Sequence, residues 1–227
     1  MSRILYDLAG EDESLRFSPY CWRAKMALAH KNLAYDTQPW RFSDKDQIAF
    51  SGQGKVPVLV DGSTIVADSQ LIADYLEEAY PHEPSLYGDA PGRSLTFFVK
   101  SWTERVLHRA IALIVLPDIH AKLAPRDRAY FRATREAAFK RTLEDIATHR
   151  HEAQIALATI LQPLHATLEQ QPFIAGDSPN YADHIIFGAL AWGRLISSTP
   201  LFEANDPLAR WMDAVLETYG LPAGLTA

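Results

Sequence analysis

The sequence has little cysteine, no long hydrophobic run and no excess of positive charge. Its 227 residues contain one cysteine, Cys21, so no disulfide can form within the chain, and we expect a reducing compartment such as the cytoplasm. The formal net charge of -6 argues against nucleic acid as a partner, because that function needs a clustered basic surface. The most apolar run, 110–116, is far shorter than the roughly 20 residues that span a bilayer. We therefore expect neither a nucleic-acid nor a membrane partner.

The apolar fraction of 48% and the charged fraction of 22% are those of an ordinary globular protein. Short strands are predicted over 4–8 and 34–38, and a helical pattern begins at Pro19 between them. A hairpin is predicted over 58–66, because its Asp-Gly dipeptide favours a tight turn between two apolar runs. An amphipathic helix follows from about residue 68 to 80. This order of elements predicts a compact α/β domain.

Proline and glycine cluster between Pro81 and Gly92, which makes this stretch the best candidate for a linker. Beyond it the pattern is helical, over about 94–122, from 125 past 164, and over 180–196 and 207–218. The second part of the chain is therefore predicted to be an all-α bundle. Charges alternate in sign between Arg126 and Arg150, a pattern typical of a solvated helix face.

The segment Phe17-Ser18-Pro19-Tyr20-Cys21 lies where the first strand gives way to the first helix. Ser18 suits the N-cap and Pro19 the first helical position. The serine has two interpretations. It caps the helix and does no more, or it serves chemistry, because a helix N-terminus stabilises a thiolate or phosphate to which a hydroxyl can donate a further hydrogen bond.

Two later segments also have a structural and a functional interpretation. In Gly54-Lys55-Val56-Pro57-Val58-Leu59 the proline fits an ordinary strand start, and its isomer is not predictable because most X–Pro bonds are trans. In Asp68-Ser69-Gln70-Leu71 the first two residues fit a helix N-cap. The serine hydroxyl and the N–H groups there could equally hold a carboxylate, with Asp68 as partner for an amino group.

These three motifs, in this order and spacing, resemble those of the glutathione S-transferase superfamily. Ser-Pro-Tyr-Cys is similar to the Cys-Pro-Tyr-Cys of glutaredoxins with serine in the first place, as in serine-type transferases. In the family the proline that matches Pro57 is cis, and the backbone before it pairs with the cysteinyl part of glutathione as an added strand does. The resemblance implies that Ser18 is catalytic and that glutathione is bound by Lys55, Val56, Pro57, Asp68 and Ser69.

The resemblance also implies the architecture. It predicts a thioredoxin-like α/β domain over 1–82, a linker over 83–92, and an all-α domain over 93–227 that contributes a hydrophobic substrate pocket. Asn180-Tyr181-Ala182-Asp183 resembles the family's capping box before a buried helix. The implied function is a glutathione transferase, usually homodimeric, that attacks an electrophilic and hydrophobic substrate, with glutathione as cosubstrate.

A finer resemblance connects the chain with bacterial glutathione-dependent β-aryl etherases and fungal FuA-class transferases. It is carried by Tyr6-Asp7-Leu8, Ser18-Pro19-Tyr20, Trp22-Arg23-Ala24-Lys25, Thr142-Leu143-Glu144-Asp145 and Asp206-Pro207-Leu208. It implies an aromatic substrate, such as a β-aryl ether derived from lignin.

Two other functions stay open. Cys21 occupies the resolving position of glutaredoxins and would serve a thiol transferase, although the first cysteine is missing and such a residue is more often part of the core. A protein of the same fold that binds hydrophobic ligands without turnover is the other. His149 and His151 stand at a spacing that faces different ways on a helix, so no metal site is predicted. Tyr20, Trp40, Trp102 and Tyr130 are candidates to line the pocket, although aromatic residues on helices are more often part of the core.

Overall fold

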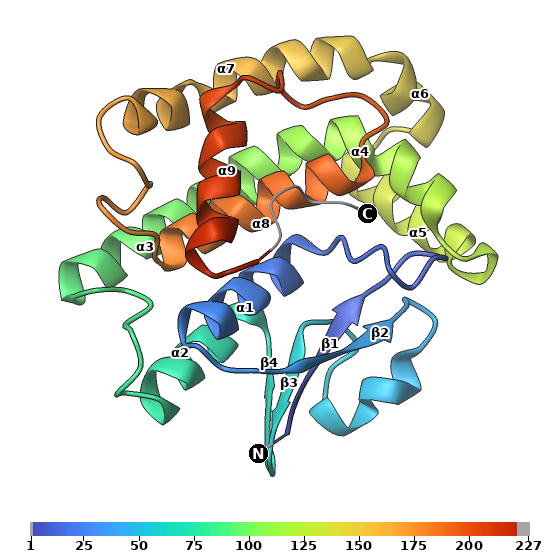
Figure 1. Ribbon diagram of the computed structural model, residues 1–227. Coiled ribbons are helices and arrows are strands. Elements are labelled where there is room, and N and C mark those ends of the chain that lie inside the picture. Colours follow the sequence, from blue (N-terminus) through green and yellow to red (C-terminus); the bar gives the residue numbers. More distant parts are fainter. Residues whose placement is uncertain (1, 222–227) are drawn as a thin grey trace.

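The computed structural model describes residues 2–221, which form a small sheet domain below a larger set of helices (Figure 1). The N-terminal elements are β1 (Arg3–Leu8), α1 (Pro19–His30), β2 (Asp36–Trp40), the 3-10 helix η1 (Lys45–Ser51), β3 (Val58–Asp61), β4 (Thr64–Ala67) and α2 (Ser69–Ala79). The predicted strands and helices are all present. β2 begins and ends two residues later than predicted and contains Pro39, which an edge strand tolerates.

The four strands are arranged in the order β2-β1-β3-β4. β1 runs parallel to β2, with Leu5 opposite Thr37, and antiparallel to β3, with Leu5 opposite Leu59. β3 and β4 form the predicted hairpin. Because β1 and β2 are parallel, the chain leaves both strands at the same edge of the sheet. The segments that lead to Ser18 and to Phe42 therefore begin side by side.

The remaining elements are helical: α3 (Ala90–Trp102), the π-helical turn η2 (Thr103–Leu107), α4 (His108–Lys122), α5 (Pro125–Phe139), α6 (Leu143–Thr148), α7 (Arg150–Leu168), α8 (Tyr181–Ile196) and α9 (Pro207–Thr218). α3 begins inside the stretch expected to link the domains, because Asp89 caps it by accepting a hydrogen bond from the N–H of Gly92 at 2.7 Å. The domain limits themselves stay a prediction, and residues 222–227 of the second domain lie outside the described residues.

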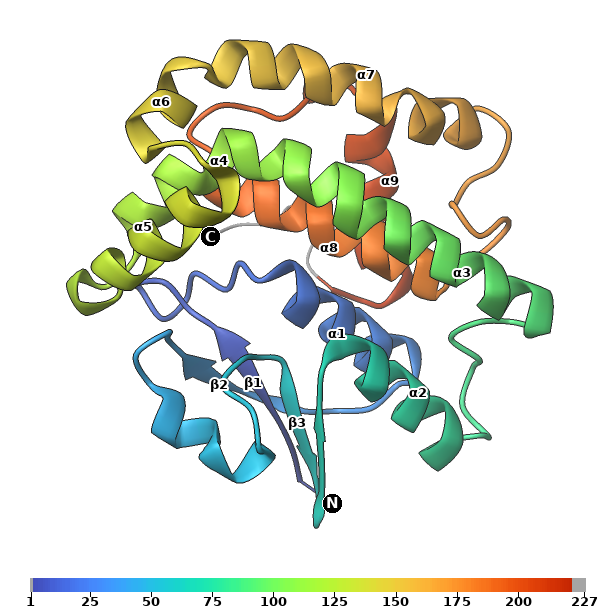
Figure 2. The same cartoon turned by 180° about the vertical axis from the view of Figure 1, so that it is seen from behind.

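The helix expected from residue 125 past 164 is instead three helices, α5, α6 and α7, which Figure 2 shows at one end and along the top of the bundle. Lys140 ends α5 in a left-handed conformation with φ 53°, and the Thr142 side chain starts α6 by accepting from the N–H of Asp145. The sequence prediction of one helix was wrong because a lysine gives no signal of a left-handed turn. Conversely, α4 continues through Pro117 to Lys122.

The two domains share their packing. α1 lies between the sheet and the bundle, where it packs against α8 (Figures 1 and 2). Gly188 of α8 permits this approach, since a Cβ atom at that position would lie 2.4 Å from the carbonyl oxygen of Pro19. One buried cluster joins Leu5 and Leu28 from the sheet domain with Ile185 from α8. The start of α1 is therefore held from both sides.

The capping box predicted at the start of α8 is confirmed. The Asn180 side chain accepts from the N–H of Ala182 at 2.8 Å, and Asp183 accepts from the N–H of Asn180 at 3.1 Å. Asp183 also accepts a hydrogen bond from the indole of Trp211. Burial nevertheless raises the pKa of Asp183 to about 6. The box fixes the helix on which α1 rests.

Candidate active site

Ser18 is the N-cap of α1, and Pro19 occupies the first turn as predicted. Its hydroxyl oxygen accepts a hydrogen bond from the backbone N–H of Cys21 at 3.3 Å. The side chain is only 4% exposed, yet it lines a cavity between the two domains. Because an accepting hydroxyl keeps its own proton, Ser18 can still donate one hydrogen bond into that cavity, beside the positive end of the α1 dipole.

Cys21 lies one turn further along α1 and is completely buried as a free thiol. Burial, and after it the charge of Asp7, raises the pKa of this thiol well above its usual range. A redox or nucleophilic cysteine needs an accessible thiolate. The surroundings of Cys21 favour the opposite, which is a small apolar side chain in a core.

The segment before β3 offers a free backbone edge. The Val56–Pro57 peptide bond is cis. Val56 lines the same cavity as Ser18, and within residues 2–221 neither its N–H nor its carbonyl has a hydrogen-bond partner. Lys55, also at the cavity wall, forms no ion pair in that part of the chain. An extended peptide could pair with the Val56 backbone as an added strand does.

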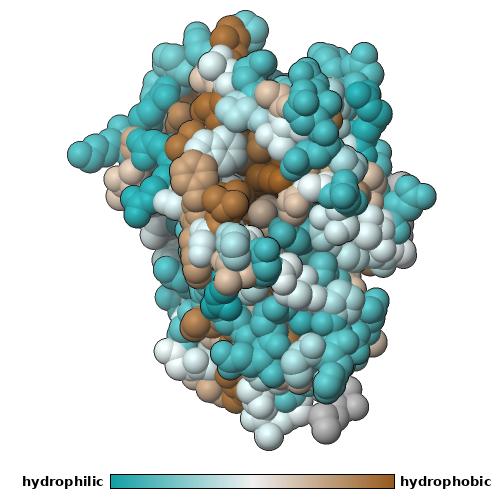
Figure 3. Space-filling view, turned by 90° about the vertical axis from the view of Figure 1, so that its left-hand side faces the viewer, coloured by the Kyte–Doolittle hydropathy of each residue, from teal (hydrophilic) through white to brown (hydrophobic). Residues whose placement is uncertain are grey.

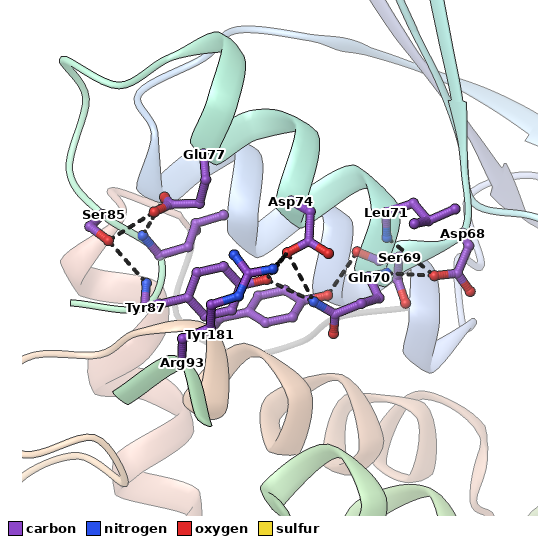
Figure 4. A network of polar contacts seen from close by, with 11 residues as sticks. Asp68, Ser69, Gln70, Leu71, Asp74, Glu77, Ser85, Tyr87, Arg93 and Tyr181 are labelled. Carbon is purple, nitrogen blue, oxygen red and sulfur yellow. Dashed lines mark hydrogen bonds and ion pairs between the residues drawn. The ribbon is translucent and has the colours of Figure 1, made fainter. Parts of the chain in front are cut away.

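Asp68 is the N-cap of α2 and accepts from the N–H groups of Gln70 at 2.8 Å and Leu71 at 3.3 Å, all through one carboxylate oxygen (Figure 4). Its backbone has φ 88°, an unfavourable value for a residue other than glycine. Asp68 therefore caps α2, and the capping bonds use one of its two carboxylate oxygens. The second oxygen remains available to a positively charged group.

Ser69 is buried, and its hydroxyl has no hydrogen-bond partner among the described residues. Its carbonyl oxygen accepts from the Tyr181 hydroxyl at 2.8 Å, so α8 of the second domain holds it in place (Figure 4). The next turns of α2 are tied to α3 through Asp74, which pairs with Arg93 at 2.8 Å and accepts from Tyr87 at 2.9 Å. The start of α2 is thus as firmly positioned as the start of α1.

The cavity has a volume of about 690 Å³, which is the size of a small-molecule site. One wall comes from the sheet domain, with Ser18, Val56 and Trp40, and the other from α4 and α5. Of the four aromatic candidates, Tyr20, Trp40 and Tyr130 line it, whereas Trp102 does not. The structure brings Ser18, Lys55 and Val56 into this cavity. Pro57, Asp68 and Ser69 do not line it. Pro57 directly follows Val56, and the N–H of Asp68 donates to the carbonyl of Pro57 at 3.2 Å.

A cluster that the sequence did not reveal stands next to Ser18. Arg23 is fully buried, pairs with Glu104 at 2.7 Å and lies over the Tyr20 ring. Its other terminal nitrogen is 3.5 Å from Nε2 of His108. Burial, helped by the charge of Arg23, lowers the pKa of His108 to about 3, so the ring is neutral. Glu104 is presented by the π-helical turn η2, a feature found often at functional sites.

A second group missed by the sequence is basic. Arg109 of α4 and Arg135 of α5 line the cavity together with Lys45. Arg135 belongs to the run of alternating charges expected to be a solvated face, and that interpretation is wrong for it: its guanidinium lies over the rings of Phe42 and Phe131. Helical spacing could have found Arg109, because residues 105, 109, 112, 116 and 119 form one stripe of the wall.

Metal ligands are not grouped in the described part of the chain: between residues 2 and 221, no three His, Cys, Asp or Glu side chains stand close enough to hold an ion. His149 interacts with Asp145 on the surface. The helices of this same part are all too short or too polar to cross a bilayer.

Comparison with known proteins places these features in a family. Residues 14–85 match the family model "Glutathione S-transferase, N-terminal domain" and residues 94–219 match "Glutathione S-transferase, C-terminal domain". A curated relative, the probable glutathione S-transferase GSTU6 of Oryza sativa subsp. japonica, is 26% identical over 202 residues, which is 86% of this chain and 78% of the relative.

Solved structures show the same fold. Glutathione transferase GSTFuA3 from Phanerochaete chrysosporium superposes with a TM-score of 0.85 at 24% identity, over 96% of this chain and 97% of the other. CsGST63524 of Ceriporiopsis subvermispora, solved in complex with glutathione, gives 0.83 at 24% identity over 98% and 99%.

Proposed function

The chain belongs to the glutathione S-transferase superfamily, and on that premise we propose that it binds glutathione between Ser18 and α2 and activates its thiol for attack on an aromatic electrophile. The single observation that carries the proposal is the Ser18 hydroxyl, which accepts from the Cys21 N–H and keeps its proton for a sulfur in the cavity. The chain has glutathione transferase function in the general sense of its family; the residue roles and the substrate class are our proposal.

Each recognition element has a counterpart in the tripeptide. The unpaired Val56 backbone suits the cysteinyl residue, and Lys55 suits the glycine carboxylate. The free hydroxyl of Ser69 suits the γ-glutamyl carboxylate at the start of α2, and the second oxygen of Asp68 suits the ammonium group. Pro57 lies in the sequence between the Lys55–Val56 contacts and the Asp68–Ser69 contacts, and its peptide bond with Val56 is cis.

The energetics of activation are within reach of these groups. A thiol has a pKa near 8.5, and lowering it by about two units takes roughly 2.7 kcal/mol. One hydrogen bond from Ser18 to the thiolate contributes about 1.5–3 kcal/mol, and the N-terminus of α1 adds about 0.3–1 kcal/mol. The thiol proton passes to solvent. The sulfur then bonds to the electrophilic carbon, and the leaving group departs with the electron pair of its bond.

The aromatic residues of the cavity support an aromatic second substrate, for which we propose β-aryl ethers of lignin-derived compounds as the first class to test, with detoxification of other aromatic electrophiles as the broader role. In ether cleavage the departing phenolate takes a proton from water. The thiol-transferase alternative finds no support in the burial of Cys21. A reducing compartment such as the cytoplasm suits both a free cysteine and a reduced thiol cosubstrate.

The experiment has two parts. Calorimetry measures glutathione binding, and mass spectrometry searches for thioether products after incubation with β-aryl ethers, halo-aromatic compounds and epoxides. We expect glutathione to bind and at least one aromatic compound to be conjugated. Binding without any product would favour a ligand-binding protein of the same fold, and failure to bind glutathione would overturn the proposal.

We also propose that the protein is a homodimer. Figure 3 shows the side from which α3 projects, where hydrophobic side chains gather around a hollow in the upper, helical half. On α3, the side chains of Leu95, Phe97 and Phe98 are 67%, 47% and 70% exposed, and exposed apolar side chains that gather in one patch mark interaction surfaces. Sedimentation should give twice the chain mass of 25.4 kDa, and Phe98→Glu should halve it. A wild-type chain that sediments as a monomer would contradict this.

A further inference from the structure

The cavity collects positive charge in an acidic protein. Five of the 22 lysine and arginine residues line it, against one of the 28 acidic residues, Glu104. Glu104 is already paired with Arg23 and Lys100. The five cations are Lys45, Lys55, Arg105, Arg109 and Arg135.

These cations lack counter-ions among the residues that the structure describes. Within residues 2–221 none of the five forms an ion pair with a carboxylate, although the same part of the chain pairs most of its other arginines. Arg135 is the clearest case. It is half-buried, and burial lowers its pKa. Its only side-chain hydrogen bond to another described residue goes to Thr134 at 3.2 Å. A partly desolvated cation without a counter-ion is unfavourable unless a ligand supplies one.

The cations fall into two groups. Lys45 and Lys55 belong to the sheet domain. Lys55 precedes Val56, on the side where glutathione is proposed to bind, whereas the Lys45 ammonium group lies 5.4 Å from the ring centre of Tyr130 on α5. Arg105, Arg109 and Arg135 belong to the opposite wall. Arg109 lies 5.4 Å from the ring centre of Phe139 on α5, and Arg135 lies 5.0 Å from that of Phe131 and 5.9 Å from that of Phe42. Arg109 and Arg135 are therefore both stacked on aromatic rings.

We propose that Arg135, assisted by Arg109, binds a carboxylate on the second substrate, so that the enzyme prefers anionic aromatic electrophiles over neutral ones. The inference rests on the proposed function. A planar guanidinium held against an aromatic ring presents its remaining N–H groups as a fork that fits a carboxylate. The substrate ring would take its place among the aromatic side chains of the same wall, with its electrophilic carbon toward Ser18.

The test compares 4-chloro-3-nitrobenzoate with its neutral methyl ester. In both, sulfur bonds to the carbon that bears chlorine, and chloride leaves with the electron pair of the broken bond. Each kcat/KM is divided by the rate constant of the uncatalysed reaction with glutathione. We expect the wild type to favour the benzoate about tenfold or more, the range of one charge-assisted contact.

Three variants locate the effect. Arg135→Gln should abolish the preference by raising the KM of the benzoate, and Arg135→Lys should restore part of it. Arg132→Gln is the matched control, since it removes one charge from the same helix at a surface residue paired with Glu136 and Glu144. It should leave the ratio unchanged. Equal effects of Arg135→Gln on both compounds would overturn the inference.

Two outcomes separate this inference from the function on which it rests. If Arg135→Gln raises the KM of glutathione and leaves the benzoate-to-ester ratio unchanged, the arginine serves the carboxylate of the tripeptide and the inference is wrong. Binding of 8-anilinonaphthalene-1-sulfonate and of neutral N-phenyl-1-naphthylamine, followed by fluorescence, needs no turnover. Suppose that the wild type binds the sulfonate more tightly than the neutral amine, that Arg135→Gln loses this preference, and that no compound is conjugated. The anion site would then be supported and the proposed reaction refuted.

Discussion

The hydroxyl of Ser18 accepts a hydrogen bond from the backbone N–H of Cys21 at 3.3 Å, one helical turn further along α1. This bond turns the proton of the serine away from its own helix, because the oxygen lone pair faces the N–H. The same residue that completes the helix end therefore presents a donor to the cavity. Capping and catalysis are compatible at this position and do not compete.

Ser18→Ala should move the alkaline rise of kcat/KM about one to two pH units upward, because the thiolate loses one hydrogen bond. The affinity for glutathione should change little, since the tripeptide has its other contacts. Rates between pH 6 and 9.5 with a halo-aromatic substrate measure the shift. Ser18→Thr, which keeps a hydroxyl, is the control. An unchanged pH profile in the alanine variant would remove Ser18 from the mechanism.

Cys21→Ala should leave conjugation within about twofold of the wild type, because the buried thiol has its pKa raised and no access to substrate. The glutathione-dependent reduction of a small disulfide should be equally slow in both proteins. Reductase activity in the wild type that disappears in the variant would instead establish a redox role for this cysteine.

Asp68 allows capping and ligand binding to be separated. Asp68→Asn keeps an oxygen for the N–H groups of Gln70 and Leu71, so the free energy of unfolding should stay the same. Asp68→Ala should lose about 1 kcal/mol. Both variants should raise the KM of glutathione several-fold, since each removes the charge that is proposed to face the ammonium group. If only the alanine variant loses affinity, the residue acts through the helix alone.

Gly188→Ala should destabilise the protein by about 1–3 kcal/mol, as overpacking at a rigid contact does. The added Cβ would lie 2.4 Å from the backbone oxygen of Pro19, which cannot move without displacing the start of α1. In an ordinary helix the same change stabilises by about 0.5–1 kcal/mol. Urea unfolding determines the sign, and a stabilised variant would disprove the tight contact.

The stability should fall as the pH drops below about 6.5. Burial lowers the pKa of His108 to about 3. Below pH 6.5 the unfolded chain therefore binds a proton at this residue and the folded chain does not, so the free energy of unfolding falls by up to about 1.4 kcal/mol per pH unit. His184, whose pKa burial also lowers, acts in the same direction, whereas the raised pKa of Asp183 opposes it. In His108→Gln the loss between pH 7.5 and 5.5 should be about 1.4 kcal/mol smaller, measured by urea unfolding. Equal losses would contradict a neutral His108.

Much of the fold was predictable because its signals are local. The Asp61-Gly62 turn, the Pro19 helix start and the capping box at Asn180 each depend on residues close in sequence. The motifs likewise pointed to Ser18, whose position at the cavity follows from a single helix end.

The features that could not be predicted from the sequence depend on contacts between distant segments or on unusual backbone angles. The break at Lys140 needs a left-handed residue that no glycine marks. The Arg23–Glu104 pair joins residues 81 positions apart. Arg135 has the sequence pattern of a surface charge, and only the folded structure shows that it lies over the ring of Phe42. The cis state of the Val56–Pro57 bond belongs to the same class.

The contact between Pro19 and Gly188 also limits how this enzyme can be recombined with its relatives. A chimera that joins the thioredoxin-like domain to a foreign helical domain would pack the first turn of α1 against whatever side chain the donor carries opposite Pro19. Only donors with glycine at the position of Gly188 would preserve the close packing of α1 on α8. Shuffled libraries built from this scaffold should therefore be filtered by that one position before any pocket residue is varied.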